Sequence, residues 1–420
     1  MNEISRRQSI KSLAALASIQ ILPSRLLGLN GQTPPSEELT RGIIGCGGIS
    51  ASHLSMPGRL LALCDVDSKH LAQRMKDADG EKNGITPYSD YRELIARKDI
   101  DIVHICTPPH WHAKMAIDAM KEGKDLWTEK PMSRTIGEGA EMVKAAEKYQ
   151  RMVRLNTWFR FKDTLYGSGM RTELLKRVTS SRILGWPLKI TVSGVTGFDW
   201  KFFWVGKTGL KEEPIPEELD YDTWLGPAPR KPYNHHRVHQ TFRGYWDYDG
   251  GGLADMGQHY LDPVQYLLEK DETAPIRVEI DADPQDADAV GTWRRITFTY
   301  ADGCQIVLDG ENKDKNAAYI EGPKGKVFKN YESDIPDFKK KIRELPKLPP
   351  MITDFHESVR TRKKFALNEE NGFWSCTIVN LGVIAHRLNK NLNFDPKTLT
   401  FDDPEATALV NQPMREPWGI

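Results

Sequence analysis

Two short segments of this 420-residue chain carry side chains suited to proton transfer at a hydroxyl group. In Gly250-Gly-Gly-Leu-Ala-Asp255-Met-Gly-Gln-His259, the carboxylate and the imidazole lie four residues apart at the start of a predicted helix, on one of its faces. His259 can accept a hydroxyl proton while Asp255 orients the ring or contacts the same hydroxyl. Glu129-Lys130-Pro131 ends a predicted strand and adds an ammonium that can hydrogen-bond a hydroxyl.

Each pattern also has a simpler interpretation. An Asp and a His four residues apart commonly form an ion pair on a helix surface, and Glu-Lys-Pro is common in surface turns. Asp255 and His259 could also bind a metal ion. No third ligand lies nearby in the sequence, so we predict no metal, although His110 and His112 keep that alternative open.

The segment Thr40-Arg-Gly-Ile-Ile-Gly45-Cys46-Gly47-Gly48-Ile49-Ser50 predicts a dinucleotide-binding turn. Gly45 permits a tight turn out of an apolar strand, and Gly47 lets backbone N–H groups approach phosphates at the next helix N-terminus. Ser50 replaces the usual third glycine or alanine but is small. Asp65 ends the apolar run 59–64 and suits ribose hydroxyls, and together with Asp67 it would repel a 2′-phosphate. The predicted cofactor is therefore NAD in preference to NADP.

Length and composition limit the class of protein. A chain of 420 residues exceeds what one core usually supports, so we expect two domains. Lys plus Arg equals Asp plus Glu at 58 each, which gives no electrostatic footprint for nucleic acid or an anionic membrane. The five cysteines include no Cys-x-x-Cys pair, and we interpret them as buried apolar side chains.

The N-terminal segment differs from the rest. Ser5-Arg6-Arg7-Gln-Ser-Ile-Lys11 precedes a mildly apolar run, 13–22, which resembles a bacterial twin-arginine export signal and is too short to span a bilayer. Because that route carries folded proteins, a cofactor bound in the cytoplasm could travel with the enzyme. We therefore predict a signal and linker over residues 1–38 and a periplasmic location; a basic N-terminus on a cytoplasmic protein is the alternative.

The remaining chain divides into two regions with different patterns of predicted secondary structure. Residues 39–161 alternate apolar runs (102–106, 125–128, 152–155) with helical stretches (68–79, 113–122, 136–149), which predicts a doubly wound parallel Rossmann sheet. Residues 162–400 have hairpin signals at 295–308 and 318–328 and helices at 253–268 and 374–388, typical of an α+β domain with an open, mostly antiparallel sheet. The charged stretch 337–347 is interpreted as a solvated connection or a helix face, and residues 401–420 as a C-terminal tail.

Taken in order, these motifs resemble the Gfo/Idh/MocA oxidoreductases, named for glucose-fructose oxidoreductase and inositol dehydrogenase. The resemblance rests on Gly45-Cys-Gly47-Gly48, Asp65, Cys106-Thr-Pro-Pro-His-Trp-His112, Glu129-Lys130-Pro131 and Asp255 to His259. It implies an NAD-binding Rossmann domain joined to a substrate domain, in homodimers or homotetramers, with Lys130, Asp255 and His259 as the catalytic triad. Segments 224–229 and 243–247 are similar to an exported, sugar-associated bacterial branch.

Position in the motifs gives the candidate contacts. We expect cofactor contacts from Gly45, Cys46, Gly47, Gly48, Ile49, Ser50, Asp65, Thr107, Pro108, His112, Glu129 and Lys130, since ligands bind beyond the carboxyl ends of parallel strands. Aromatic and multi-donor groups suited to sugar hydroxyls and pyranose faces are Trp158, Arg160, Arg243, Tyr245 and Trp246. Each of these could instead be ordinary packing, and Arg160 could simply pair with a carboxylate.

Three functions fit these residues. The first is oxidation of a secondary hydroxyl of a sugar, cyclitol or glycoside with hydride passing to NAD; Lys130 positions the hydroxyl and His259 acts as base. The second is a glycosidase or lyase in which tightly bound NAD oxidises the substrate transiently. The third is a non-catalytic protein that binds a sugar and the cofactor. In each case the partner is a small molecule.

Overall fold

In the computed structural model, the described residues are 38–157, 159–161, 165, 169–194, 198, 200–313 and 316–420. The chain divides into Met1–Leu39 and Thr40–Ile420, and the account below concerns the second unit. The predicted export signal and the candidate sugar contact Trp158 lie outside the described residues. Among those that are described, no helix is long and apolar enough to cross a membrane.

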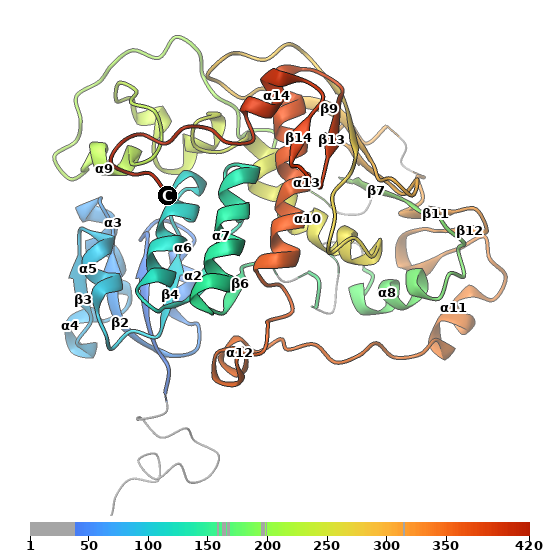
Figure 1. Ribbon diagram of the computed structural model, residues 1–420, viewed down its shortest axis with the longest axis horizontal. Coiled ribbons are helices and arrows are strands. Elements are labelled where there is room, and N and C mark those ends of the chain that lie inside the picture. The colour runs from blue at the N-terminus through green and yellow to red at the C-terminus, as the bar shows by residue number, and fades with distance from the viewer. Residues whose placement is uncertain are drawn as a thin grey trace, which may run out of the picture. The chain divides into compact units, whose positions relative to one another are not determined.

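The N-terminal half of this unit is built on a parallel sheet of six strands in the order β3-β2-β1-β4-β5-β6 (Figure 1). The order reverses between β1 and β4, and such a switch point opens a crevice at the carboxyl ends of the two strands. Ile43, Val103 and Ile105 are fully buried, as expected for a sheet covered on both faces. The strands are β1 Thr40–Ile44, β2 Arg59–Cys64, β3 Thr86–Tyr88, β4 Ile102–Ile105, β5 Asp125–Thr128 and β6 Val153–Leu155.

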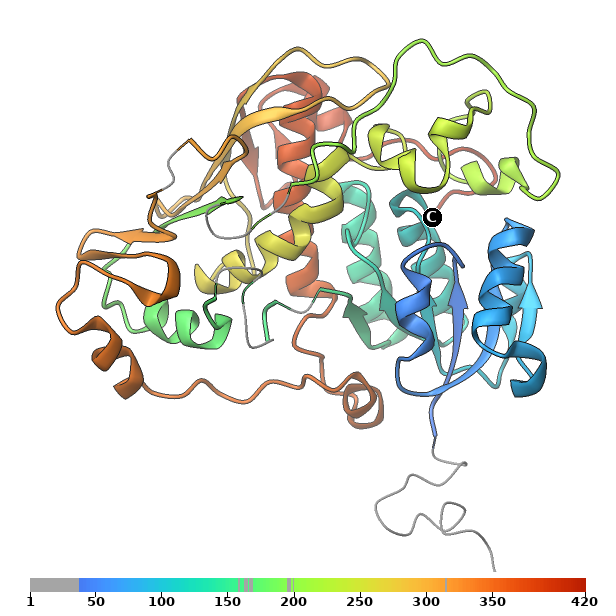
Figure 2. The same ribbon diagram turned by 180° about the vertical axis from the view of Figure 1, so that it is seen from behind.

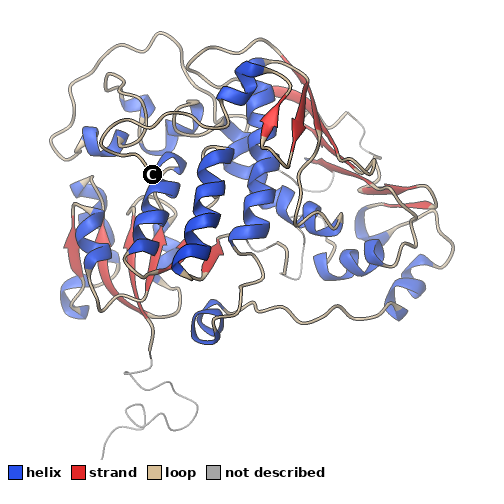
Figure 3. Ribbon diagram, in the orientation of Figure 1, coloured by secondary structure: helices blue, strands red, loops and turns tan. Residues whose placement is uncertain are grey.

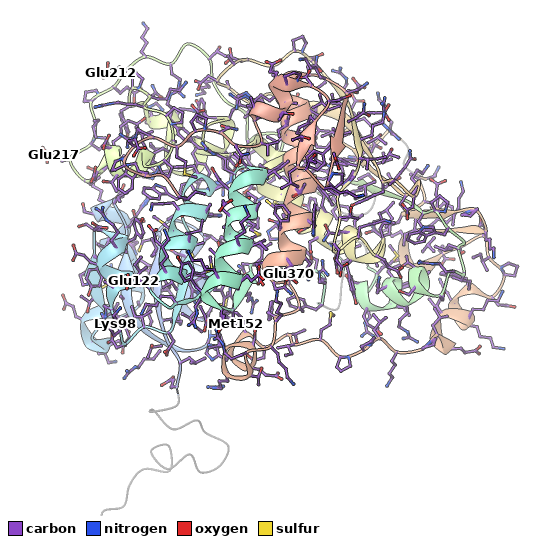
Figure 4. The ribbon with its side chains drawn as sticks, in the orientation of Figure 1. Lys98, Glu122, Met152, Glu212, Glu217 and Glu370 are labelled. Atoms are coloured by element: carbon purple, nitrogen blue, oxygen red, sulfur yellow. The ribbon has the colours of Figure 1, made fainter. Side chains whose placement is uncertain are left out.

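Helices follow these strands and cover the sheet, as Figure 3 shows. The longest is α7, Ile136–Tyr149, which begins where the Thr135 side chain accepts a hydrogen bond from the Glu138 backbone N–H. The others are α2 Ser50–Leu54, α3 Ser68–Asp77, α4 Gly80–Asn83, α5 Tyr91–Ala96, the 3₁₀ turn η3 Pro109–Trp111 and α6 His112–Lys121. At the solvent side, Lys98 and Glu122 form an ion pair of 3.0 Å (Figure 4).

The C-terminal half contains a second sheet of eight strands, ordered β12-β11-β7-β10-β9-β8-β13-β14. Only β10 and β7 pair in parallel, so the sheet is mostly antiparallel, as predicted. Gln305 pairs with Thr299 across the predicted hairpin turn. The strands are β7 Lys189–Ser193, β8 Arg277–Ala282, β9 Trp293–Thr299, β10 Gln305–Asp309, β11 Ile320–Gly322, β12 Gly325–Val327, β13 Leu392–Asp395 and β14 Thr400–Phe401.

Two long helices connect the halves. Helix α13, Glu369–Leu388, packs against α7 and against α10, Gly251–Leu267, so it lies between the two sheets (Figures 1 and 2). Close packing depends on small residues: a Cβ at Gly257 would lie 3.1 Å from Val379, and one at Gly382 would lie 3.0 Å from Leu253. This packing holds α10, with Asp255 and His259, against the mouth of the parallel sheet.

Shorter helices complete the C-terminal half. They are α8 Thr172–Ser180, α9 Tyr221–Leu225, η5 His235–Arg237, η6 His239–Gly244, η7 Lys329–Tyr331, α11 Phe338–Lys341, η8 Ile342–Glu344, α12 Phe355–Thr361 and α14 Pro404–Ala408. The stretch 337–347, predicted as a solvated connection or a helix face, contains the short helices α11 and η8. The segment 401–420, predicted as a tail, contains α14 and the second residue of β14. All five cysteines are buried and free, as expected.

Candidate active site

The turn after β1 is shaped by its neighbour strand. Gly45 has φ +90°, and a Cβ there would lie 2.7 Å from the carbonyl carbon of Cys106, directly after β4. Only glycine fits such a crossing without moving backbone. A Cβ at Gly47 or Gly48, in contrast, would meet nothing within 4 Å. The turn therefore leaves open space beside its backbone, which is the cradle that a pyrophosphate requires.

Ser50, the unusual third fingerprint residue, is buried inside this turn. Its Oγ donates a hydrogen bond to the Gly47 carbonyl at 2.6 Å, and Arg74 donates to the same carbonyl at 3.1 Å. Cys46 is also buried, and its backbone N–H donates to Asp65 Oδ2 at 2.6 Å. Ser50 and Cys46 thus hold the shape of the turn from behind, instead of lining the cavity as expected.

Asp65 lies directly after β2, where the acidic residue of a ribose site is expected. Its oxygens accept hydrogen bonds from the backbone N–H groups of Cys46 and Asp67, at 2.6 and 2.8 Å. Burial raises the pKa of Asp65, an effect that these two hydrogen bonds oppose. The position of this carboxylate beside the glycine turn fits an unphosphorylated adenosine ribose.

One cavity of about 860 Å³ extends from the glycine turn to the predicted catalytic residues. Its wall combines the carboxyl ends of the parallel strands with η6 and α10 from the C-terminal half. Of the predicted cofactor contacts, it includes Gly45, Gly47, Gly48, Ile49, Asp65, Thr107, Pro108, Glu129 and Lys130. The catalytic candidates Asp255 and His259 line the same cavity. Residues from both halves of the chain therefore meet in one space large enough for a cofactor and a small substrate.

Lys130, Asp255 and Arg243 form the charged centre of the cavity. Lys130 Nζ donates to the Asp255 side chain at 3.0 Å and to its backbone carbonyl at 2.5 Å. Arg243 Nε donates to the same carboxylate oxygen at 2.7 Å. Burial alone would raise the pKa of Asp255, but the two cations outweigh that effect and hold the pKa well below its usual range. Asp255 is therefore an anion that fixes both cations in place.

His259 lies one helical turn after Asp255 on the same face of α10, where it is partly buried. Burial, reinforced by the positive charge of Lys130, lowers its pKa to about 3. The imidazole is consequently neutral at physiological pH, the form in which it can accept a proton. Its ring packs edge-on against Phe159, with ring centroids 5.7 Å apart.

His110 and His112, the residues that kept a metal site with Asp255 and His259 open, bind backbone carbonyl groups instead. His110 Nε2 lies 3.0 Å from the Trp224 carbonyl oxygen, and the two ring nitrogens of His112 lie 2.7 and 2.8 Å from the carbonyl oxygens of Pro131 and Thr107. His112 is fully buried there and does not line the cavity, so the prediction that it contacts the cofactor is wrong. Within the described part of the chain, the group with metal-ligand spacing is instead Asp67, His70 and His239.

Of the predicted sugar contacts that the structure describes, only Arg243 borders the cavity. The buried Arg160 guanidinium pairs with Asp262 at 2.7 Å and Asp271 at 2.6 Å, so it is structural. Tyr245 is fully buried, and its hydroxyl lies 2.7 Å from His236 Nδ1. The buried Trp246 donates its indole N–H to the Asp286 carbonyl at 3.0 Å. The prediction that these three residues contact a sugar is therefore wrong, and the alternative holds: Tyr245 and Trp246 are packing residues, and Arg160 pairs with carboxylates.

A buried polar network behind Lys130 could not be found from the sequence. Glu129 Oε1 accepts hydrogen bonds from Asn156 at 2.5 Å and lies 2.7 Å from His53 Nε2, while His53 Nδ1 lies 2.8 Å from His104 Nδ1. Burial opposes ionisation of Glu129, but His53 and Lys130 lower its pKa overall. The network fixes the backbone that carries Lys130. No motif marks His53 or Asn156.

The comparisons with known proteins agree with this architecture. Residues 39–157 match the NAD-binding Rossmann fold of the Gfo/Idh/MocA oxidoreductase family, and residues 168–420 match the C-terminal α/β domain of the same family. The chain therefore belongs to the Gfo/Idh/MocA oxidoreductases, and its N-terminal half is an NAD-binding domain. The predicted family, fold class and cofactor are confirmed.

Individual relatives are more distant. An α-N-acetylgalactosaminidase of Shewanella oneidensis is 33% identical over 181 residues, a match that spans 36% of this chain and 39% of that protein. The chain thus matches about two fifths of the length of such curated relatives, several of which are named glycosyl hydrolase family 109 proteins.

Solved structures share the fold at low identity. The WlbA dehydrogenase of Chromobacterium violaceum, solved with NADH and UDP-GlcNAcA, has a TM-score of 0.58 at 19% identity and covers 86% of this chain and 96% of its own. An aldose-aldose oxidoreductase of Caulobacter crescentus, solved with glycerol, has a TM-score of 0.53 at 18% identity and covers 85% of this chain and 100% of its own.

Proposed function

We propose that this protein oxidises a secondary hydroxyl group of a sugar, a cyclitol or a glycoside, with hydride passing to NAD. The observation that carries the proposal is the convergence of Lys130, Asp255 and His259 on the cavity that also holds the open glycine turn. A neutral base, a cation and a dinucleotide cradle in one cavity are the parts that an alcohol dehydrogenation requires. The sugar-directed names of the similar proteins support the substrate class.

Each residue has a role that follows from its charge and contacts. Lys130, which is held by Asp255, can donate a hydrogen bond to the substrate oxygen and so stabilise the negative charge that develops as the proton leaves. His259 accepts that proton because it is neutral and borders the cavity. Asp255 holds Lys130 and Arg243, and Arg243 is left to orient a substrate hydroxyl. When bound, NAD supplies the hydride acceptor.

Purification followed by native mass spectrometry and a substrate panel tests the proposal. We expect a retained dinucleotide of the mass of NAD, and NADH absorbance on mixing with some sugar, cyclitol or glycoside. Lys130→Met should abolish NADH formation while NAD is still bound, whereas Lys144→Met, on the exposed face of α7, should behave as wild type. A protein that binds NAD but turns over no member of a broad panel would indicate a non-catalytic binding protein.

A second candidate is a glycosidase or lyase that oxidises its substrate only transiently. The likeness to an α-N-acetylgalactosaminidase and to glycosyl hydrolase family 109 proteins favours this reading. In that case bond cleavage proceeds without net change of the cofactor. Product formed in excess of NADH would support it, and NADH formed in equal amount with a carbonyl product would support the dehydrogenase.

We further propose that the protein is exported in the folded state and works as a homodimer or homotetramer. The paired Arg6 and Arg7 before an apolar run support export. Replacing both with Lys should retain the protein in the cytoplasm, as measured by fractionation. Native mass spectrometry gives the subunit number, and a monomer would contradict the assembly.

A further inference from the structure

Asp249 is a buried carboxyl group that the roles above do not use. It lies two residues before α10, is 5% exposed, and borders the main cavity. It also borders a second cavity of about 20 Å³, which is lined by Arg134 and Arg387 and is large enough for a water molecule. Asp249 therefore separates the substrate space from a polar pocket behind it.

The hydrogen bonding of Asp249 is incomplete. Its Oδ1 accepts no hydrogen bond from any residue in the described ranges. A buried carboxylate is costly without partners, whereas the protonated group needs fewer. Burial and the negative charge of Asp255 raise the pKa of Asp249 to about 7, against the opposite influence of Arg243 and Lys130. The group is therefore balanced between its two protonation states near neutral pH.

We propose that Asp249 is a second acid–base group of the active site, which takes up the proton that the substrate hydroxyl gives to His259. The inference rests on the oxidation proposed above. Asp249 and His259 border the same cavity, so hydrogen-bonded solvent in that cavity can carry a proton between them. Desolvation of its ring and the positive charge of Lys130 disfavour a protonated His259, whereas burial and the nearby Asp255 favour the protonated form of Asp249.

The step balances in atoms and charge. The substrate C–H bond breaks and its electron pair leaves with hydrogen as hydride to NAD; the O–H bond breaks and its proton goes to His259 and then to ionised Asp249. The products are a carbonyl compound, NADH and neutral Asp249. When bound, NAD would supply a positive charge in its oxidised form, which would favour ionised Asp249, and the loss of that charge on reduction would favour the neutral acid. The charges that face Asp249 are Asp255, Arg243 and Lys130 in the main cavity and Arg134 and Arg387 behind it.

Proton counting in a single turnover tests the assignment. Protein loaded with NAD is mixed, near neutral pH and in weak buffer, with the sugar, cyclitol or glycoside that gave the strongest NADH absorbance in the panel above. Absorbance reports NADH, and an indicator dye reports released protons. If Asp249 stores the proton, wild type releases clearly less than one proton per NADH, and Asp249→Asn releases one. Asp247→Asn is the matched control, because Asp247 lies two residues away and faces Lys231 at 3.5 Å; it should keep the wild-type yield. Equal yields from wild type and Asp249→Asn overturn the proposal.

Infrared spectroscopy provides a readout that needs no turnover. Wild-type protein should show a carboxyl C=O band that titrates near neutral pH and is missing from Asp249→Asn, or from Asp249→Ser should the first variant not fold. Absence of such a band from wild type overturns the proposal. A titrating band without NADH formation from any hydroxyl substrate instead overturns the oxidation, and with it the role of Asp249 in that reaction.

Discussion

Substituting Gly45 with Ala tests the geometry on which cofactor binding depends. A methyl group at this position would lie 2.7 Å from the carbonyl carbon of Cys106, 2.8 Å from its oxygen and 2.9 Å from the backbone nitrogen of Thr107. All three atoms belong to backbone, so no side-chain rotation can relieve the contacts. Because β1 and β4 pair in register just before this point, the methyl group would push the two central strands of the sheet apart.

Two costs add at this position. A non-glycine residue held at φ +90° costs about 1–3 kcal/mol. Forcing a methyl group into a filled space costs about 1–3 kcal/mol more. We therefore expect Gly45→Ala to lose roughly 4 kcal/mol of unfolding free energy, which for a domain of this size lowers Tm by roughly 8–16 °C.

Gly47→Ala is the matched control, two residues along the same turn. A Cβ at Gly47 meets nothing within 4 Å, so thermal unfolding of the cofactor-free protein should be close to wild type. Its methyl group would enter the phosphate cradle instead, and NAD affinity measured by calorimetry should fall by at least about tenfold. If Gly45→Ala unfolds at the wild-type temperature, the close crossing of β1 and β4, and the turn built on it, are wrong.

Three further predictions follow from the site and its support. His259→Asn should lower kcat by roughly 10²–10⁴-fold without loss of bound NAD, and unchanged kcat would contradict its role as base. The pKa of His259 falls from 6.5 to about 3 on folding, so protonation favours the unfolded chain and stability declines as pH falls below 6.5. Between pH 6.5 and 4.5, the unfolding free energy of wild type, measured in urea, should fall by roughly 2–3 kcal/mol more than that of His259→Asn. Equal pH dependence of the two proteins would refute a desolvated, neutral His259 ring in the folded state. Asp262→Asn should lower the free energy of unfolding by about 3 kcal/mol, because it leaves the Arg160 guanidinium buried with only Asp271. A raised KM at unchanged Tm would contradict this and would indicate that Arg160 contacts the substrate.

The parallel sheet could be predicted because its signals are local. Strand β2 and helix α7 begin and end at the predicted residues. An apolar run marks the strand and a Thr cap marks the start of the helix, and both signals lie within a few positions of the element. Helix α13 was expected to begin at Trp374 but begins at Glu369. Its cap is formed by the side chains of Asn368 and Asn371, a pair that is not the usual Ser/Thr and Glu combination.

The site was predicted only where motif spacing determines it. Lys130, Asp255 and His259 follow from short motifs, and they meet in one cavity although 125 residues separate Lys130 from Asp255. The predictions for Arg160, Tyr245 and Trp246 were wrong because residue type does not reveal the partner. A carboxylate that binds Arg160, for example, lies 102 residues further along the chain. Asp249 did have a local signal, since it immediately precedes the three glycines that open α10.

The contacts at the far end of the cavity bear on whether NAD leaves after each turnover. Residues 218–220 pair with the segment after β2: the Ser68 N–H donates to the Glu218 carbonyl at 2.9 Å, and the Asp220 N–H donates to the Val66 carbonyl at 3.0 Å. His239, the first residue of η6, lies 3.5 Å from Asp67, and η6 forms part of the cavity wall. A dinucleotide with its adenosine ribose at Asp65 would lie beside these contacts, and its exchange would be expected to depend on them.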